Sequence, residues 1–90
     1  IPTDDSLKMS VDMLREQIRL DLAQNLVPTM LVATAGATSS GAIDPISELE
    51  EIARKEEMWF HVDAAWGGAA ALVPELAGLV QGMGKADSIT

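Results

Sequence analysis

The sequence predicts an α/β fold in which a mainly parallel sheet is flanked by helices. Three observations support this prediction. Helix-like and strand-like patterns alternate along the 90 residues, which favours parallel strands joined by helical crossovers. Residues 29–34 form a continuous apolar run, as expected for a strand that helices cover on both faces. A second run, residues 58–63, ends in the carboxylate of Asp63.

The first helix is expected at residues 10–25. Ser10 suits the N-cap position, and Asn25 suits the end of the helix. Four apolar residues recur at spacings of three and four and form one stripe for packing: Val11, Leu14, Ile18 and Leu22.

The second helix is expected to begin at Asp44-Pro45, with Asp44 as the N-cap and Pro45 in the first helical position. Four apolar residues should face inward: Ile46, Leu49, Ile52 and Ala53. Two ion pairs should lie on the outer face: Glu50 with Arg54 and Glu51 with Lys55.

The last third of the chain predicts irregular helix and then a strand. Residues 67–81 are small and apolar, so we expect them to be partly helical, with an interruption near Pro74. Residues 86–90 resemble the opening of a third strand. A domain rarely ends inside a strand, because the strand backbone must be paired. We therefore interpret residues 1–90 as part of a larger domain, truncated at both ends; a small three-stranded domain is the alternative.

Composition excludes several classes of function. The net charge is −8, and the six Lys and Arg residues form no basic run, which argues against nucleic acids and anionic membrane surfaces. No window is apolar and long enough to span a bilayer. With no cysteine and one histidine, we expect no disulfide and no metal site. The N-terminus does not resemble a signal peptide, and the sequence predicts a cytoplasmic protein.

Asp63 is the first candidate site residue. Ligands of open α/β sheets bind outside the carboxyl ends of the strands, and Asp63 lies at such an end. Ala65, two residues later, is small enough to leave space for a flat ligand. The alternative is that Asp63 caps the following segment or accepts backbone N–H groups.

Thr38 and His61 are the other polar candidates. Thr38 lies in the loop after residues 29–34 and offers a hydroxyl, although it can instead bond its own backbone. By strand alternation, His61 and Asp63 face the same side of the sheet, so His61 can lie behind Asp63 and hold its carboxylate. The alternative is a hydrogen-bonded core histidine.

Two motifs together carry a family resemblance: residues 61–68, His-Val-Asp-Ala-Ala-Trp-Gly-Gly, and residues 33–45 around Gly36-Ala37-Thr38. They closely resemble the group II pyridoxal-phosphate-dependent decarboxylases, which act on glutamate or aromatic amino acids. Ala37 departs from the Gly-Thr-Thr that is common in the family. The resemblance implies the large domain of the aspartate-aminotransferase type (fold type I), with pyridoxal 5'-phosphate as cofactor.

The resemblance also implies roles for individual residues. Asp63 would pair with the pyridine nitrogen of the cofactor, Ala65 would pack on one face of its ring, and Thr38 would contact it. No catalytic residue is expected within the chain, because the family's Schiff-base lysine would lie beyond Thr90. The three lysines present do not match it: Lys8, Lys55 and Lys85.

The implied activity is decarboxylation of an amino acid by a homodimeric parent enzyme, of which the 90-residue chain alone would be inactive. Which amino acid is the substrate does not follow from these residues. Two alternatives stay open. One is a truncated, non-catalytic homologue that acts as a structural or partner-binding module. The other is a different enzyme of the same fold, such as an aminotransferase or a desulfurase.

Overall fold

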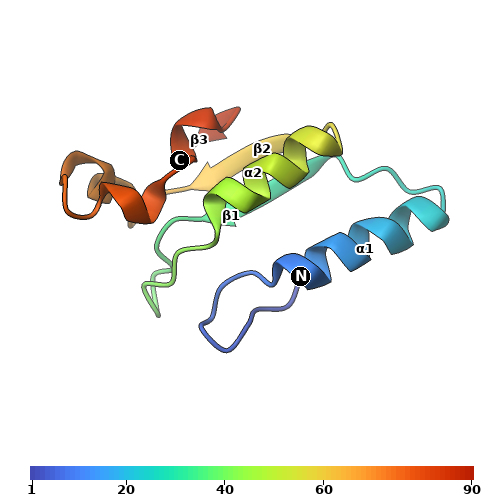
Figure 1. Ribbon diagram of the computed structural model, residues 1–90, viewed down its shortest axis with the longest axis horizontal. Coiled ribbons are helices and arrows are strands. Elements are labelled where there is room, and N and C mark those ends of the chain that lie inside the picture. The colour runs from blue at the N-terminus through green and yellow to red at the C-terminus, as the bar shows by residue number, and fades with distance from the viewer.

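The computed structural model describes all 90 residues, Ile1–Thr90 (Figure 1). Its helices and strands are α1 (Val11–Ala23), β1 (Met30–Thr34), α2 (Ile46–Lys55), β2 (Trp59–Asp63) and β3 (Ser88–Ile89). Three short 3-10 helices join β2 to β3: η1 (Gly68–Leu72), η2 (Ala77–Val80) and η3 (Met83–Lys85). They leave a gap around Pro74, as predicted. No helix has the length and apolar character needed to cross a membrane.

The three strands form one parallel sheet in the order β1-β2-β3, which confirms the predicted fold class. Met30 is paired with Trp59 at the start of β1 and β2, and Thr34 is paired with Asp63 at their ends. This register brings the carboxyl ends of both strands to the same edge of the sheet. His61 in β2 is paired with Ser88 in β3.

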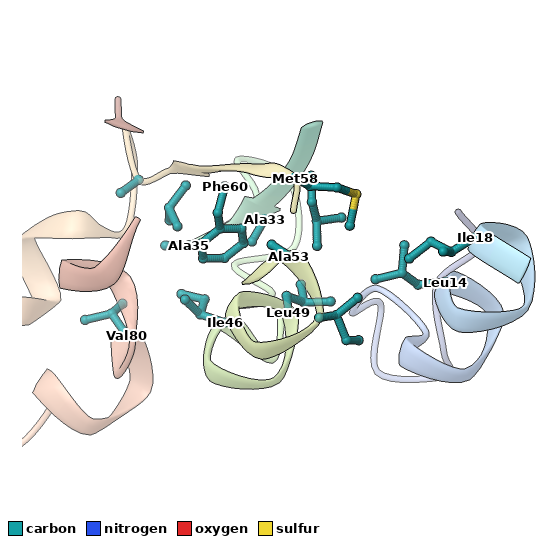
Figure 2. Close-up of a cluster of buried hydrophobic side chains, with 14 residues drawn as sticks. Leu14, Ile18, Ala33, Ala35, Ile46, Leu49, Ala53, Met58, Phe60 and Val80 are labelled. Atoms are coloured by element: carbon teal, nitrogen blue, oxygen red, sulfur yellow. The ribbon is translucent and has the colours of Figure 1, made fainter. Parts of the chain in front are cut away.

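One face of the sheet carries the core. Phe60 and Val62 of β2 are fully buried, and so is Ala33 of β1. Figure 2 shows Phe60 and Ala33 next to Ala53 of α2, with Leu14 and Ile18 of α1 directed towards α2 from beside it. Helix α2 thus packs directly on the sheet, and α1 lies beside α2 (Figure 1).

The other face is open, which corrects the expectation that helices cover both faces. Burial alternates along both strands, and the side chains of Met30, Val32 and Trp59 are 51%, 42% and 52% exposed. The molecule accordingly measures only 17 Å along its shortest axis. Apolar residues at every position of a strand predict burial on both sides, but residues 1–90 supply cover for one side only.

Helix α1 confirms most of its predicted features. The Ser10 hydroxyl caps it by accepting a hydrogen bond from the Met13 N–H at 3.4 Å. Leu14 and Ile18 are buried. The apolar stripe is shorter than predicted, because Leu22 at the end of the helix is 49% exposed.

Helix α2 begins differently from the prediction. Pro45 occupies the N-cap position and makes no side-chain cap. The carboxylate of Asp44 instead accepts the backbone N–H groups of Met9 at 2.7 Å and Thr34 at 2.8 Å. Asp44 therefore joins the N-terminal segment to the end of β1. The four predicted inward residues of α2 are all buried.

The charged side chains of α2 also differ from the prediction. Glu50 pairs with Arg54 at 3.3 Å, but Glu50 is buried rather than on the outer face. Lys55 lies 3.3 Å from Glu56 instead of pairing with Glu51. The buried Glu50 carboxylate has two cationic partners, because Lys85 also lies 3.5 Å from it.

Candidate functional site

The candidate site lies where β1 and β2 end. The N–H of Ala35 donates to the carbonyl of Asp63 at 2.7 Å, which extends the strand pairing by one residue. The N–H of Gly67 then donates to the carbonyl of Ala35 at 3.0 Å. The loop after β1 and the loop after β2 are therefore fastened to each other directly beside Asp63.

Two glycines allow these loops to approach so closely. A Cβ atom on Gly67 would lie 2.3 Å from the carbonyl oxygen of Ala35, a distance that no side chain tolerates. A Cβ atom on Gly36 would lie 3.0 Å from the backbone of Gly67, and Gly36 has a φ of +92°, which favours glycine. The sequence motifs include both glycines, but nothing in the sequence indicated that they contact each other.

Asp63 points to the open side of this edge and is exposed. One oxygen, Oδ1, accepts the backbone N–H of Ala65 at 3.2 Å. The carboxylate takes part in none of the ion pairs of the chain. The predicted alternative, a bond to the local backbone, thus holds for one oxygen, and the carboxylate keeps capacity to accept a further donor.

Ala65 and Thr38 are exposed at the same edge. Ala65 follows Asp63 by two residues, and its backbone is fixed by the bond to the Asp63 carboxylate. Thr38 lies two residues after Gly36 in a turn that is closed by the bond from the Gly41 N–H to the Ala37 carbonyl, at 2.7 Å. The fold therefore brings the loops of the three predicted cofactor-binding residues to one end of the sheet.

His61 occupies the predicted face, and of its two predicted roles the structure has the hydrogen-bonded histidine and not the support of Asp63. Its ring nitrogens lie 2.7 Å from Ser88 Oγ (Nδ1) and 3.1 Å from Thr90 Oγ1 (Nε2). Both nitrogens are thus engaged by hydroxyl groups, and His61 does not hold the Asp63 carboxylate. Sequence reasoning missed Ser88 and Thr90 because they lie 27 and 29 residues further along the chain.

An ion pair anchors the start of β3. Arg54 Nη1 donates to both carboxylate oxygens of Asp87 at 3.0 Å. One of these oxygens also accepts the Phe60 N–H at 2.7 Å. The Phe60 N–H and then Arg54 lower the pKa of Asp87 below its ordinary value. Arg54 also donates to the carbonyl of Lys85 at 2.6 Å. These bonds hold the segment before β3 against α2.

None of the main clefts of the chain is lined by Asp63, Ala65 or Thr38. One of these clefts, about 470 Å³, is a groove between α1 and α2 with mixed charged and apolar walls. It is lined by Arg15, Ile18, Arg19, Leu22, Glu51, Ile52, Lys55 and Glu56. No group of three His, Asp or Glu side chains is arranged to hold a metal ion. The side chain of Lys85 is 71% exposed.

Known proteins share both the sequence and the fold of this chain. Tryptophan decarboxylase 2 of Oryza sativa subsp. japonica is 45% identical over 81% of this chain and 15% of its own length. The histidine decarboxylase of Rattus norvegicus is 43% identical over 100% of this chain and 14% of its own. The solved structure of Catharanthus roseus tryptophan decarboxylase in complex with L-tryptophan superimposes with a TM-score of 0.92 at 40% identity, covering 99% of this chain and 20% of that one.

The chain thus spans less than a fifth of the length of the curated relatives it matches. The superposition confirms the predicted α/β architecture over nearly every residue. The model of the pyridoxal-dependent decarboxylase conserved domain matches residues 1–90. With a family match over the whole chain and relatives above 40% identity, this chain belongs to the pyridoxal-dependent decarboxylase family.

Proposed function

We propose that this chain is part of a longer pyridoxal-phosphate-dependent enzyme that decarboxylates an amino acid, and that Asp63, Ala65 and Thr38 bind the cofactor. The observation that supports this most is the state of Asp63. Its carboxylate lies at the carboxyl edge of a parallel sheet, has no cationic partner, and keeps acceptor capacity on the open side. Ligands of open α/β sheets bind at this edge.

The residues at the edge fit the cofactor. A protonated pyridine nitrogen is a single N–H donor, and the carboxylate of Asp63 is an acceptor with one oxygen bonded to Ala65. Ala65 has only a methyl group, so a flat ring has room against the backbone. The loop that carries Thr38 is held beside Asp63 by the contact between Gly36 and Gly67.

The bound cofactor would supply a ring that accepts electrons when a bond to the substrate's α-carbon breaks. Asp63 would keep the proton on the ring nitrogen, because a carboxylate stabilises a positive charge next to it. Ala65 would restrict the ring to one plane. Thr38 would add a hydroxyl hydrogen bond at the side of the first loop.

The substrate is proposed only as a class, an amino acid with an aromatic, imidazole or acidic side chain. Relatives are named tryptophan decarboxylase and histidine decarboxylase, so the family match alone does not distinguish the side chain. The homodimeric state and the cytoplasmic location expected from the sequence stay predictions. So does the interpretation of residues 1–90 as one part of the cofactor-binding large domain.

The test is made on the full-length protein that contains this chain. Asp63→Asn removes the charge but keeps the shape of the side chain. We expect it to weaken pyridoxal phosphate binding by about tenfold to a hundredfold, the effect of losing one charge-assisted hydrogen bond. Release of carbon dioxide from tryptophan, histidine and glutamate would be measured in parallel to identify the substrate class.

Asp5→Asn is the matched control, because Asp5 is exposed and lies far from the edge in the sequence. It should change neither cofactor affinity nor turnover. If the unaltered full-length protein does not bind pyridoxal phosphate, the proposal is wrong and the partner-binding module becomes the leading alternative. If it binds the cofactor but Asp63→Asn leaves affinity and turnover intact, the role of Asp63 is wrong.

A further inference from the structure

A chain of side-chain hydrogen bonds crosses the open face from β2 to β3. The indole Nε1 of Trp59 donates to Ser88 Oγ at 2.9 Å. Ser88 Oγ lies 2.7 Å from Nδ1 of His61, and Nε2 of His61 lies 3.1 Å from Thr90 Oγ1. The register places His61 directly opposite Ser88, so the two strands hold this arrangement in place.

The indole group sets the direction of this hydrogen-bond chain. An indole N–H is a donor only, so Ser88 Oγ must accept from Trp59. The hydroxyl hydrogen of Ser88 then has one ring nitrogen in reach, His61 Nδ1, which accepts it if that nitrogen carries no proton. Nε2 of His61 then carries the proton and donates to Thr90 Oγ1.

The two other protonation states of His61 fit the arrangement less well. A proton on Nδ1, in the second neutral tautomer or in the imidazolium, would give Ser88 Oγ two donors and leave its own hydrogen without a partner. Ser88 is half-buried, so an unpaired hydroxyl there is unfavourable.

We propose that Trp59 and Ser88 are positioning residues that fix His61 as the neutral imidazole protonated on Nε2. The consequence concerns Asp63 and rests on the proposed function. His61 and Asp63 project from the same face of β2, about 6.6 Å apart, which is twice the rise per residue of a strand. A cationic imidazole there would compete with the pyridine nitrogen for the Asp63 carboxylate, and a neutral one leaves that carboxylate to the cofactor.

No other ionisable group of the sheet faces His61. The residues that share its face are Met30, Val32 and Thr34 of β1, Trp59 and Asp63 of β2, and Ser88 and Thr90 at the third strand. Asp87, which precedes β3, is turned away and bonded to Arg54. The tautomer of His61 is therefore set by its two hydroxyl partners.

The first measurement is the tautomer of His61 in the full-length protein with ¹⁵N-labelled histidine. The signal of His61 is assigned as the one that disappears in His61→Gln. We expect Nε2 to carry the proton and Nδ1 to be unprotonated at neutral pH. A protonated Nδ1 in the unaltered protein would overturn the proposal.

Trp59→Phe removes the donor that sets the direction, so His61 should become a mixture of tautomers. Ser88→Ala should have the same effect, and Ser88→Thr, which keeps the hydroxyl, should restore the single tautomer. Trp66→Phe is the matched control, because it deletes an indole group that is 64% exposed and outside this hydrogen-bond chain. A single unchanged tautomer in both Trp59→Phe and Ser88→Ala would overturn the proposal.

The second measurement is the affinity for pyridoxal phosphate. Ser88→Ala should weaken it by roughly three- to tenfold, and Ser88→Thr should restore it. Failure of the unaltered protein to bind the cofactor would contradict the proposed function, while the tautomer measurement would still decide the present proposal. Normal cofactor affinity in Ser88→Ala, together with a mixed tautomer, would overturn the link between His61 and Asp63.

Discussion

At the scale of single residues, the geometry of the site depends on two glycines that have no Cβ atom, Gly36 and Gly67. Asp63 and Thr38 lie at the ends of neighbouring strands, but the loops after these strands meet only because Gly36 and Gly67 have no Cβ. The carbonyl of Ala35 fills the space that a side chain at Gly67 would need. Gly67 therefore does not tolerate even one added methyl group.

Gly67→Ala tests this contact. The added Cβ would lie 2.3 Å from the Ala35 oxygen, so the two loops must separate. We expect a loss of about 2–3 kcal/mol in the free energy of unfolding, typical of overpacking against a backbone that cannot move freely. Urea unfolding measures it. Gly78→Ala is the control, because a Cβ there meets nothing within 4 Å, and equal stability losses in the two variants would contradict the prediction.

A second residue-scale prediction concerns the pH dependence of the Asp87 anchor. The Phe60 N–H and Arg54 lower the pKa of Asp87 below 3.8, so the folded state favours the ionised carboxylate. The stabilisation from Asp87 is therefore fully present above about pH 4 and is lost as the pH falls through the lowered pKa. Asp87→Asn should lower the urea midpoint at pH 7 and lower it much less at pH 2.5.

Asp5→Asn serves as its control, because Asp5 is exposed and its loss should leave the midpoint unchanged at both pH values. An Asp87→Asn effect that is the same at pH 7 and pH 2.5 would show that the lost contribution does not come from the ionised carboxylate.

The sequence was a good guide to residues whose role depends on their position within an element. Asp63 follows a strand, and its place at the carboxyl edge of the sheet follows from that alone. His61 was placed on the correct face for the same reason, and its hydrogen-bonded ring was one of two predicted interpretations, but its partners were not identified. Ser88 and Thr90 are 27 and 29 residues away, and only the register of β2 against β3 brings them to the ring.

At the scale of elements, both helices end in the same way. After α1, Asn25 has a φ of 59°, and the N–H groups of Asn25 and Leu26 donate to the carbonyls of Leu22 and Asp21. After α2, Glu57 has a φ of 55°, and the corresponding bonds come from Glu57 and Met58. This is the Schellman motif, whose left-handed residue is usually glycine or asparagine.

Glu57→Gly should therefore stabilise the protein. A non-glycine residue in the left-handed conformation costs about 1–2 kcal/mol, and glycine removes that cost while adding some flexibility to the unfolded chain. We expect a net gain of about 0.5–1 kcal/mol, measured by urea unfolding. Glu57→Ala is the control, because alanine keeps the Cβ atom. A gain from alanine equal to that from glycine would assign the effect to charge instead of conformation.

Helix and strand positions followed from periodicity, because packing against one neighbour repeats along each element. Interactions that join several elements did not follow from it. Asp44 has the sequence context of an N-cap, yet its carboxylate is used by Met9 and Thr34, which come from two other segments. The sequence also did not show that only one face of the sheet is buried. An apolar residue in a strand does not indicate whether residues 1–90 include an element that packs on it.

At the scale of the whole molecule, the open face of the sheet exposes apolar side chains. Met30, Val32 and Trp59 expose a patch of apolar surface on the face opposite α2. Large apolar patches on sheets are sites of association, because covering them removes apolar surface from water. In its long relatives, the segment that matches this chain is less than a fifth of the protein.

The 90-residue chain produced alone should therefore associate through this face. We expect sedimentation equilibrium to give a mass of at least twice 9.5 kDa, increasing with concentration. Val32→Lys should shift the chain towards the monomer, because a charge on this face opposes its burial. Val27→Lys is the control, since Val27 is 76% exposed but precedes the sheet. A monomer at all concentrations, or an equal effect of both lysines, would show that this face does not drive association.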